Sequence, residues 1–523
     1  MTKGIDKYSI DSTDYTIGQD NVQKWGFDVH NPVFGVSAGL IAAFLLATLL
    51  TDPEVAKSVL DGIKWKIIGA FDWLFIWAGN IFVLFCLFLI VSPYGKIRLG
   101  GKEATADYSF VSWLSMLFAA GMGIGLMFWS VAEPTAYYTG WYETPLGVEA
   151  YTPEAAKLAL GATMFHWGLH PWAIYGVVAL SLAFFAYNKG MPLSIRSVFY
   201  PILGDRAWGW AGHIVDILAV LATLFGLATS LGLGAQQAAS GIHHVFGVDA
   251  GIGLQIIVIV SVTLLAVVSV VRGIDGGVKV ISNINMIVAF LLLILVAMIG
   301  YAVTLGTIPT TLMAYIENII PLSNPHGRAD EAWFQGWTVF YWAWWISWSP
   351  FVGMFIARVS KGRTVREFIT AVLLVPTFVT LIWMSVFGGL AIDQVVNKVG
   401  ELGAKGLTDV SLAMFQMFDV LPFGNILSII AVILVLVFFI TSSDSGSLVI
   451  DSITAGGKID APVPQRIFWA MLEGAIAIAL LWIGGTQAVQ ALQAAAISTA
   501  LPFTLILLLM CVSLIKGMRT ERF

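Results

Sequence analysis

Long hydrophobic runs separated by short polar segments dominate this chain from end to end. Each run has about the 20 apolar residues that a helix needs to cross a bilayer, and the pattern predicts about twelve transmembrane helices. The predicted spans lie at roughly 33–51, 65–92, 109–138, 157–186, 209–237, 251–271, 280–306, 334–358, 364–392, 422–450, 464–484 and 487–515. Short amphipathic stretches near 310–321 and 408–420 are expected to lie at the membrane surface. The fold class is therefore an all-α integral membrane protein.

Composition and charge support this class and suggest an orientation. Of 523 residues, 58% are hydrophobic and 11% are charged, against roughly 25% charged in soluble proteins. Most of the 27 lysines and arginines fall on the side that carries both termini, which predicts cytoplasmic termini. The polar first 30 residues contain no signal-peptide core. Cys86 and Cys511 lie in apolar runs, so neither a disulfide nor a metal cluster is predicted.

Two predicted spans contain residues that interrupt helices. The third span holds GMGIG (121–125) and the eighth holds SWSPFVG (347–353). Matched interruptions in two halves of a chain are typical of inverted-repeat transporters with a binding site near the middle of the membrane. The alternative for GMGIG is a helix-packing face of small residues.

The predicted organisation follows from these two halves, and the chain shows no sign of a soluble domain. It consists of a cytoplasmic segment 1–32, two peripheral helices in 33–108, a first repeat 109–306, an external connecting helix in 307–333, a second repeat 334–515 and a cytoplasmic tail 516–523.

Tryptophans crowd the eighth span in the sequence YWAWWISW (341–348). At about 100° per residue, Trp344, Trp345 and Trp348 share one helix face. Such faces form cages for quaternary ammonium groups. A second aromatic cluster in the fourth span holds Trp167, Trp172 and Tyr175. Ordinary core packing is the alternative for both clusters.

The surrounding polar groups refine the expected ligand. Neither aromatic cluster contains an acidic residue, which favours a methylated cation over a primary amine. Free backbone amides at the glycine break would receive a carboxylate, so the substrate is expected to be a zwitterion. In FFITSSDSGS (438–447), the hydroxyls of Thr441, Ser442 and Ser443 suit an alkali cation. Bonds from these hydroxyls to the preceding turn are the alternative.

Ionisable residues inside predicted spans are functional candidates by default. Glu133 is expected to be a structural or gating residue near the outer end of its span. Asp444 is expected to cap or pair near the cytoplasmic side. The complete set is Asp72, Glu133, His166, His170, Asp216, Asp444 and Glu473.

Four segments together resemble the betaine/carnitine/choline transporter family. They are AAGMGIGLMFWSVAEP (119–134), TMFHWGLHPWAIY (163–175), FYWAWWISWSPFVGMFIARVSKGRT (340–364) and FFITSSDSGS. The resemblance covers essentially all predicted spans. It implies a leucine-transporter-like fold of five plus five helices preceded by two extra helices. It also implies a homotrimer in the bacterial plasma membrane that takes small onium compounds and binds no nucleic acid.

The resemblance also implies particular site residues. The substrate site would consist of Trp167, Tyr175, Trp344, Trp345 and Trp348, with Phe340 beside them, Trp342 nearer the cytoplasmic exit, and Met122 and Gly123 at the glycine break. The sodium site would use the backbones of Ala119, Met122 and Phe438 and the hydroxyls of Thr441 and Ser442.

Three positions distinguish among members of that family. Gly125 stands where choline-type members tend to carry an aspartate, which favours a zwitterion. Sodium-independent carnitine exchangers of the family place an arginine from the fifth span near the sodium site, and the segment 217–234 has no basic residue, which favours sodium symport over exchange. Leu227 stands where sodium-coupled betaine members of the family can offer a threonine hydroxyl to a second sodium site around Thr223 and Phe351. One sodium ion is therefore expected, and the stoichiometry stays open.

These expectations describe a sodium-coupled importer of glycine betaine or a similar solute such as dimethylsulfoniopropionate. A substrate:product exchanger, a proton-coupled choline or carnitine carrier and an ion channel remain alternatives. An enzyme is not expected, because no nucleophile–base pair or metal motif stands out. The short tail predicts little osmotic activation through the tail itself.

Overall fold

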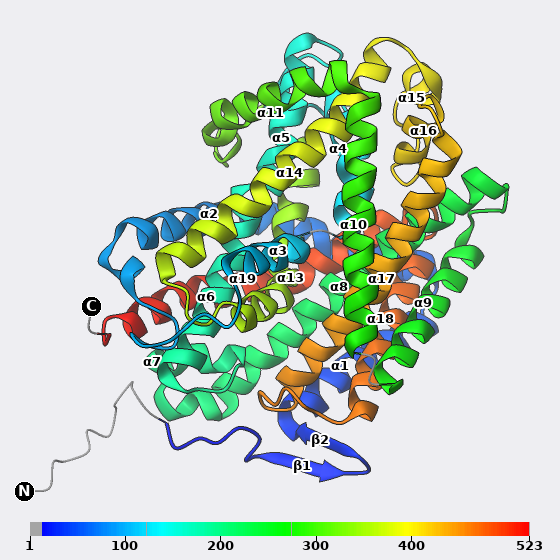
Figure 1. Ribbon diagram of the computed structural model, residues 1–523. Helices are drawn as coiled ribbons and strands as arrows, with labels where there is room; N and C mark the ends of the chain where they lie inside the picture. The colour runs from blue at the N-terminus through cyan, green and yellow to red at the C-terminus, as the bar shows by residue number, and fades with distance from the viewer. Residues whose placement is uncertain (1–12, 122, 273–274, 522–523) are drawn as a thin grey trace, which may run out of the picture.

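The computed structural model describes residues 13–121, 123–272 and 275–521, and most of this chain is helical (Figure 1). Helices dominate because a backbone in hydrocarbon must satisfy its own hydrogen bonds. The longer helices are α1 Asn31–Leu50, α2 Pro53–Val91, α3 Phe110–Gly121, α4 Ile124–Thr139, α5 Pro153–Trp167, α6 Leu169–Lys189, α8 Trp210–Phe246, α9 Ile252–Arg272, α10 Asp275–Ile299, α11 Tyr301–Leu322, α13 Val339–Val359, α14 Val365–Val396, α17 Gly424–Thr454, α18 Val463–Gly484 and α19 Ala488–Met518. The short ones are α7 Tyr200–Leu203, α12 Glu331–Trp333, α15 Gly400–Lys405 and α16 Ala413–Asp419.

Within the described residues, nine helical segments are long and apolar enough to cross a membrane. One of them joins α5 with α6, and another joins α18 with α19. The remaining two predicted spans are the broken α3–α4 pair and the tryptophan-rich α13. The fold is therefore that of an all-α membrane protein, as the sequence predicts.

Burial separates an inner group of helices from an outer one. In the most apolar stretch of α5–α6 and of α8, 89% and 83% of the residues are buried, but in α1 and α10 only 22% and 28% are. Helix α13 packs against α6, α8 and α19, and α17 packs against α8. The exposed apolar faces of α1, α2, α9 and α10 suit contact with lipid, and the inner helices enclose the candidate site.

The interruption of the third span is present, but the predicted interruption of the eighth span is wrong. Helix α3 ends at Gly121 and α4 begins at Ile124, with Gly123 extended between them (φ −171°, ψ −170°). Helix α13 instead continues through Pro350. Pro350 has no N–H to bond the carbonyl of Ile346, but the Ser349 hydroxyl donates to that carbonyl at 2.7 Å. A side-chain hydrogen bond thus replaces the missing backbone one.

The fourth predicted span is divided into α5 and α6 at Gly168 (φ −97°, ψ −127°). A Cβ at Gly168 would lie 2.6 Å from the carbonyl oxygen of Met164 and 2.8 Å from the hydroxyl of Tyr315. Tyr315 accepts a hydrogen bond from the backbone N–H of Leu169 (3.0 Å), which satisfies one free donor at the start of α6. The kink brings Trp167 and Tyr175 to the same region of the bundle.

The boundary after the seventh predicted span also differs from the prediction. Helix α10 ends at Ile299, and α11 is one helix from Tyr301 to Leu322 rather than a short surface piece at 310–321. Between them, a Cβ at Gly300 would lie 2.4 Å from a methyl carbon of Leu390 in α14. Close packing against α14 therefore sets this boundary, which hydrophobicity alone does not mark.

The N-terminal polar segment forms a small antiparallel hairpin that was not predicted. Strands β1 (Asn21–Lys24) and β2 (Phe27–His30) are joined by Trp25 and Gly26, both with positive φ (53° and 81°), as the favoured two-residue hairpin turn requires. The Asn21 amide donates to the carbonyl oxygen of Ala455 at 2.9 Å, and Asp28 pairs with Lys458. The hairpin lies at the opposite end of the bundle from α15 and α16 (Figure 1).

Candidate functional site

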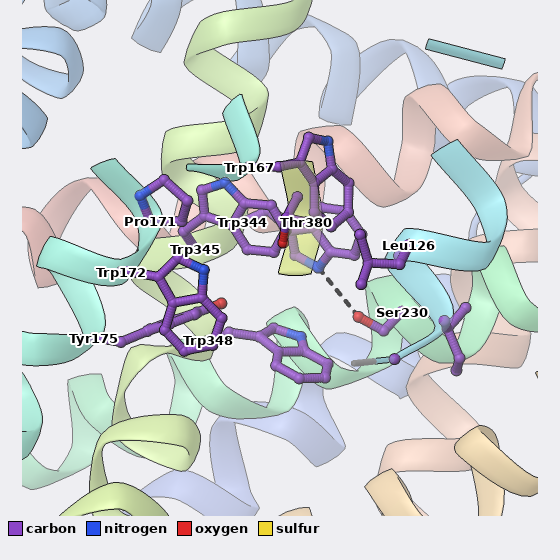
Figure 2. A pocket seen from close by; sticks show the side chains of 13 residues that line it. Leu126, Trp167, Pro171, Trp172, Tyr175, Ser230, Trp344, Trp345, Trp348 and Thr380 are labelled. Carbon is purple, nitrogen blue, oxygen red and sulfur yellow. Dashed lines mark hydrogen bonds between the residues drawn. The ribbon is translucent and has the colours of Figure 1, made fainter. Parts of the chain in front are cut away.

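A cavity of about 50 Å³ lies where the start of α4 meets α5, α6, α8, α13 and α14. This space holds several water-sized groups. Figure 2 shows indole rings from two segments of the chain gathered around it. The lining residues are Gly123, Ile124, Gly125, Leu126, Trp167, Pro171, Trp172, Tyr175, Ser230, Trp344, Trp345, Trp348 and Thr380.

The indoles of α13 and α5 form a cage with nearly perpendicular walls. Trp344 and Trp345 are stacked, with ring centroids 4.9 Å apart and planes at 13°. Trp167 stands at 74° to Trp345, with a centroid distance of 4.8 Å, and Tyr175 stands at 80° to Trp345. This arrangement follows from the one-face spacing of the α13 tryptophans and from the kink at Gly168. It presents aromatic rings to one small volume from several directions.

All four cage tryptophans use their indole N–H groups within the protein. The bonds run from Trp167 to Glu133 Oε2 (2.6 Å), from Trp344 to Ser230 Oγ (3.1 Å), from Trp345 to the His166 carbonyl oxygen (2.8 Å) and from Trp348 to the Gly226 carbonyl oxygen (2.9 Å). Each ring is therefore held at its nitrogen. What these four rings offer a ligand is aromatic carbon, whose negative face attracts a cation.

The first turn of α4 supplies the polar end of the cavity. Gly123, Ile124, Gly125 and Leu126 line it, and backbone N–H groups in a first helical turn have no partner within their helix. They attract a negative group, reinforced by the helix dipole. A Cβ at Gly125 would lie 2.8 Å from Cη2 of Trp167 and 3.0 Å from Cη2 of Trp344, so glycine allows the cage to touch this turn.

Glu133 lies directly behind the Trp167 wall of the cage. Its side chain is fully buried, and beyond Trp167 it accepts hydrogen bonds from Tyr341 (2.5 Å) and Tyr137 (2.9 Å). His166 Nδ1 is 3.0 Å from Glu133 Oε1. The sequence singled out Glu133 as a structural or gating residue but gave no sign of its contact with Trp167, because the two are far apart along the chain.

The structure brings together most of the predicted substrate residues. Gly123, Trp167, Tyr175, Trp344, Trp345 and Trp348 line the cavity. Phe340 stacks on the far side of Trp344, with centroids 5.5 Å apart and planes at 15°, so it lies beside the cage as expected. Met122 falls outside the described residues.

Trp342, which the resemblance places nearer the cytoplasmic exit, does not line the cavity. Its ring stacks on His170 at a centroid distance of 5.2 Å, and it packs close to Gly79 of α2, because it projects from a different face of α13. Prediction also missed the hydroxyl residues Ser230 and Thr380, which line the cavity. Each is a single polar residue in an apolar run, so only the packing of α8 and α14 reveals it.

Three of the five predicted sodium residues line a second cavity of about 140 Å³. Phe438, Thr441 and Ser442 of α17 meet Trp348 there, so the Trp348 indole borders both cavities. The Thr441 hydroxyl donates to the carbonyl oxygens of Val437 (3.1 Å) and Phe438 (3.2 Å), the back-bonding that the sequence left as an alternative. Ala119 lies in α3 with its side chain undescribed, and Met122 again falls outside the described residues.

Residues around the second predicted sodium position are apolar or already bonded. The Thr223 hydroxyl donates to the Ala219 carbonyl oxygen at 2.7 Å. Leu227 is fully buried, and its methyl carbon lies 2.4 Å from where a Cβ of Gly446 would stand. Leu227 thus fills the gap between α8 and α17 with hydrocarbon, which gives a cation no oxygen ligand at that point.

The hydroxyls and acids farther along α17 face α18. Ser443 donates to Glu473 Oε2 at 3.1 Å, so it points away from Thr441 and Ser442, which face the second cavity. Asp444 pairs with Arg466 at 3.1 Å, and the predicted pairing of Asp444 is confirmed. These contacts hold the two helices together and separate Ser443 from the candidate ion site.

Comparison with known proteins extends the likeness over the whole chain. Residues 32–523 match the betaine/carnitine/choline family transporter model. The chain is 87% identical over 522 residues to "Glycine betaine transporter 1" of Vibrio parahaemolyticus, covering 100% of both chains. It is 41% identical to a glycine betaine transporter of Bacillus subtilis, covering 94% of each chain.

A second Vibrio parahaemolyticus relative, a glycine betaine/proline/choline/ectoine transporter, is 70% identical over 521 residues and covers 100% of this chain and 93% of its own. A solved manganese transporter of Eremococcus coleocola aligns over 80% of this chain and 83% of its own, at 15% identity and a TM-score of 0.40. The family model and the relatives place the chain, as a membrane transporter and not an enzyme, in the betaine/carnitine/choline transporter family.

Proposed function

We propose that this transporter imports glycine betaine, or a closely similar methylated onium zwitterion, together with sodium. The observation that carries the proposal is the cage of four indoles with bonded N–H groups, set directly against the free first turn of α4. Relatives whose names specify glycine betaine transport support the same substrate.

The two ends of the cavity match the two ends of such a zwitterion. A trimethylammonium group carries a positive charge but no N–H, so aromatic faces satisfy it better than hydrogen-bond acceptors do. The carboxylate of the same molecule fits the N-terminal turn of α4, where free amides and the helix dipole favour negative charge. Dimethylsulfoniopropionate carries a sulfonium cation and a carboxylate, so it suits the same arrangement.

Sodium coupling is proposed at the second cavity. Thr441 and Ser442 offer hydroxyl oxygens there, the type of ligand that a hard cation prefers. Because Trp348 borders both cavities, an ion held by α17 and a solute held by the cage would stabilise the same position of this indole. One ion per cycle is proposed, since hydrocarbon from Leu227 occupies the other candidate position.

We further propose alternating access in a homotrimer of the bacterial inner membrane, with both termini cytoplasmic. Excess positive charge on the side of the termini supports this orientation, and the broken α3–α4 pair at the cavity is typical of transporters that open alternately to either side.

Uptake into liposomes tests this function directly. Purified protein is reconstituted, and labelled glycine betaine uptake is measured with an inward sodium gradient, with potassium in its place, and with unlabelled dimethylsulfoniopropionate, choline or carnitine as competitors. Symport predicts saturable uptake that collapses without sodium. Uptake that needs internal substrate but not sodium would establish exchange, uptake driven by a proton gradient would establish proton coupling, and a non-saturating current would establish a channel.

A further inference from the structure

The cage has a buried acid behind its wall, although none of its lining residues is acidic. Glu133 projects from α4, and its Oε2 atom accepts the Trp167 indole N–H at 2.6 Å. The carboxyl group is fully buried, and the indole ring separates it from the cavity. A charge placed there acts on a ligand across the indole ring.

Hydrogen-bond donors converge on both carboxyl oxygens of Glu133. Trp167 and Tyr341 donate to Oε2, and Tyr137 donates to Oε1. Indole N–H is a donor only, so Oε2 acts as an acceptor there. Three converging donors satisfy a carboxylate, which accepts hydrogen bonds at both oxygens.

Within the described residues, Glu133 pairs with no lysine or arginine, and its neighbour His166 carries a charge only when protonated. The nearby Arg328 is paired with Asp330 at 2.7 Å. Buried charges in proteins are normally paired. The cavity on the other side of Trp167 is where a cation would complete this pairing.

We propose that Glu133 is the counter-charge of the cage and makes it select a cationic head group over a neutral one of the same shape. A carboxylate bonded to the indole N–H adds electron density to the ring that faces the ligand, and it attracts the ligand cation directly. Two unit charges on the order of 9 Å apart, at an effective dielectric constant of about 20, change an affinity roughly twentyfold. This inference rests on the proposed transport of an onium zwitterion.

The test compares glycine betaine with 3,3-dimethylbutanoate, in which carbon replaces the quaternary nitrogen and the carboxylate is kept. Their dissociation constants are measured by competition against labelled glycine betaine on the full-length protein. Glu133→Gln is expected to lower the affinity for glycine betaine relative to that for 3,3-dimethylbutanoate roughly twentyfold, because the two ligands share a carboxylate and differ in the charge of the head group. The amide fits the site, because its oxygen can accept from Trp167 and Tyr341 while its NH2 group donates to His166 Nδ1 or to the Tyr137 hydroxyl.

Two matched variants separate charge from positioning. Tyr137→Phe removes a donor to Glu133 but keeps the charge, so it is expected to change both affinities by the same factor. Glu133→Asp keeps the charge and is expected to preserve the ratio of the two affinities. If Glu133→Gln does not fold, the double variant Glu133→Gln/Tyr137→Phe is used, because it removes the Tyr137 hydroxyl that faces the new amide. The ratio of the affinities for glycine betaine and 3,3-dimethylbutanoate is then measured on the double variant.

The outcomes are distinct. An unchanged ratio in Glu133→Gln overturns the counter-charge role and leaves Glu133 as a group that only orients Trp167. Failure of the wild-type protein to bind glycine betaine would instead overturn the proposed function.

Discussion

Replacing Trp345 with leucine tests the cage most directly. The indole of Trp345 is stacked on Trp344, meets Trp167 edge-on, and lines the cavity. Leucine fills part of the same volume with hydrocarbon but has no negative ring face. A desolvated cation–π contact contributes about 1–2 kcal/mol, which corresponds to a roughly 5- to 30-fold weaker dissociation constant for glycine betaine.

A second effect of Trp345→Leu falls on stability and not on affinity. The variant removes the donor that bonds the His166 carbonyl oxygen at 2.8 Å, which costs about 1 kcal/mol or more. That carbonyl is unpaired in both the free and the bound protein, so the cost cancels in the dissociation constant. Trp345→Phe removes the same hydrogen bond but keeps a ring, and we expect it to bind betaine more tightly than the leucine variant does.

The assay is isothermal titration calorimetry of the purified protein with glycine betaine at saturating sodium, alongside a thermal melt. Trp342→Leu is the matched control, since Trp342 lies on the same helix but stacks on His170 outside the cavity. It is expected to lower the melting temperature while keeping the dissociation constant within about twofold of wild type. A folded Trp345→Leu protein with wild-type affinity would refute the cage.

Three further predictions concern neighbouring features. Gly125→Ala places a methyl group 2.8 Å from Cη2 of Trp167, and such overpacking costs about 1–3 kcal/mol. The variant should therefore bind betaine at least fivefold more weakly, as measured by calorimetry. Unchanged binding would mean that the Trp167 ring moves freely. Thr441→Ala combined with Ser442→Ala should raise the sodium concentration for half-maximal uptake, and an identical sodium curve would remove the ion from α17. Burial and the Arg196 guanidinium lower the pKa of His30 to about 3, so the docked hairpin holds a neutral His30. In the undocked segment, the His30 imidazole binds a proton below about pH 6.5, so docking of the hairpin should weaken by about 1 kcal/mol at pH 5.5. Amide hydrogen exchange in β1–β2, corrected for the intrinsic rate at each pH, should therefore be faster at pH 5.5 than at pH 7.5. Equal protection at the two pH values would contradict this linkage.

Patterns within one helix were predictable from sequence. Trp344, Trp345 and Trp348 share a face because helical spacing fixes it, and the structure puts all three on one cavity. The break at Gly123 was also predictable, since closely spaced glycines weaken a helix. In both cases the information lies within a few residues of the feature.

Features that depend on contacts between distant segments were not predictable in the same way. Pro350 suggests a break in α13, but the Ser349 hydroxyl satisfies the carbonyl that proline leaves free. Gly168 looks like an ordinary helix residue until Tyr315 of α11 is seen against it. Glu133 meets Trp167 only because α4 and α5 pack together, and spacing along the chain carries no trace of that contact.

If the four indoles hold the onium group as proposed, their ring carbon bears on which amines the cage accepts. Glycine carries three N–H bonds on its ammonium, and each successive methylation removes one until glycine betaine carries none. An N–H that leaves water for a wall of ring carbon loses its hydrogen bond, and each such loss costs about 1–3 kcal/mol. On the proposed function, an under-methylated solute would incur this penalty for each N–H that faces an indole instead of the Ser230 or Thr380 hydroxyl.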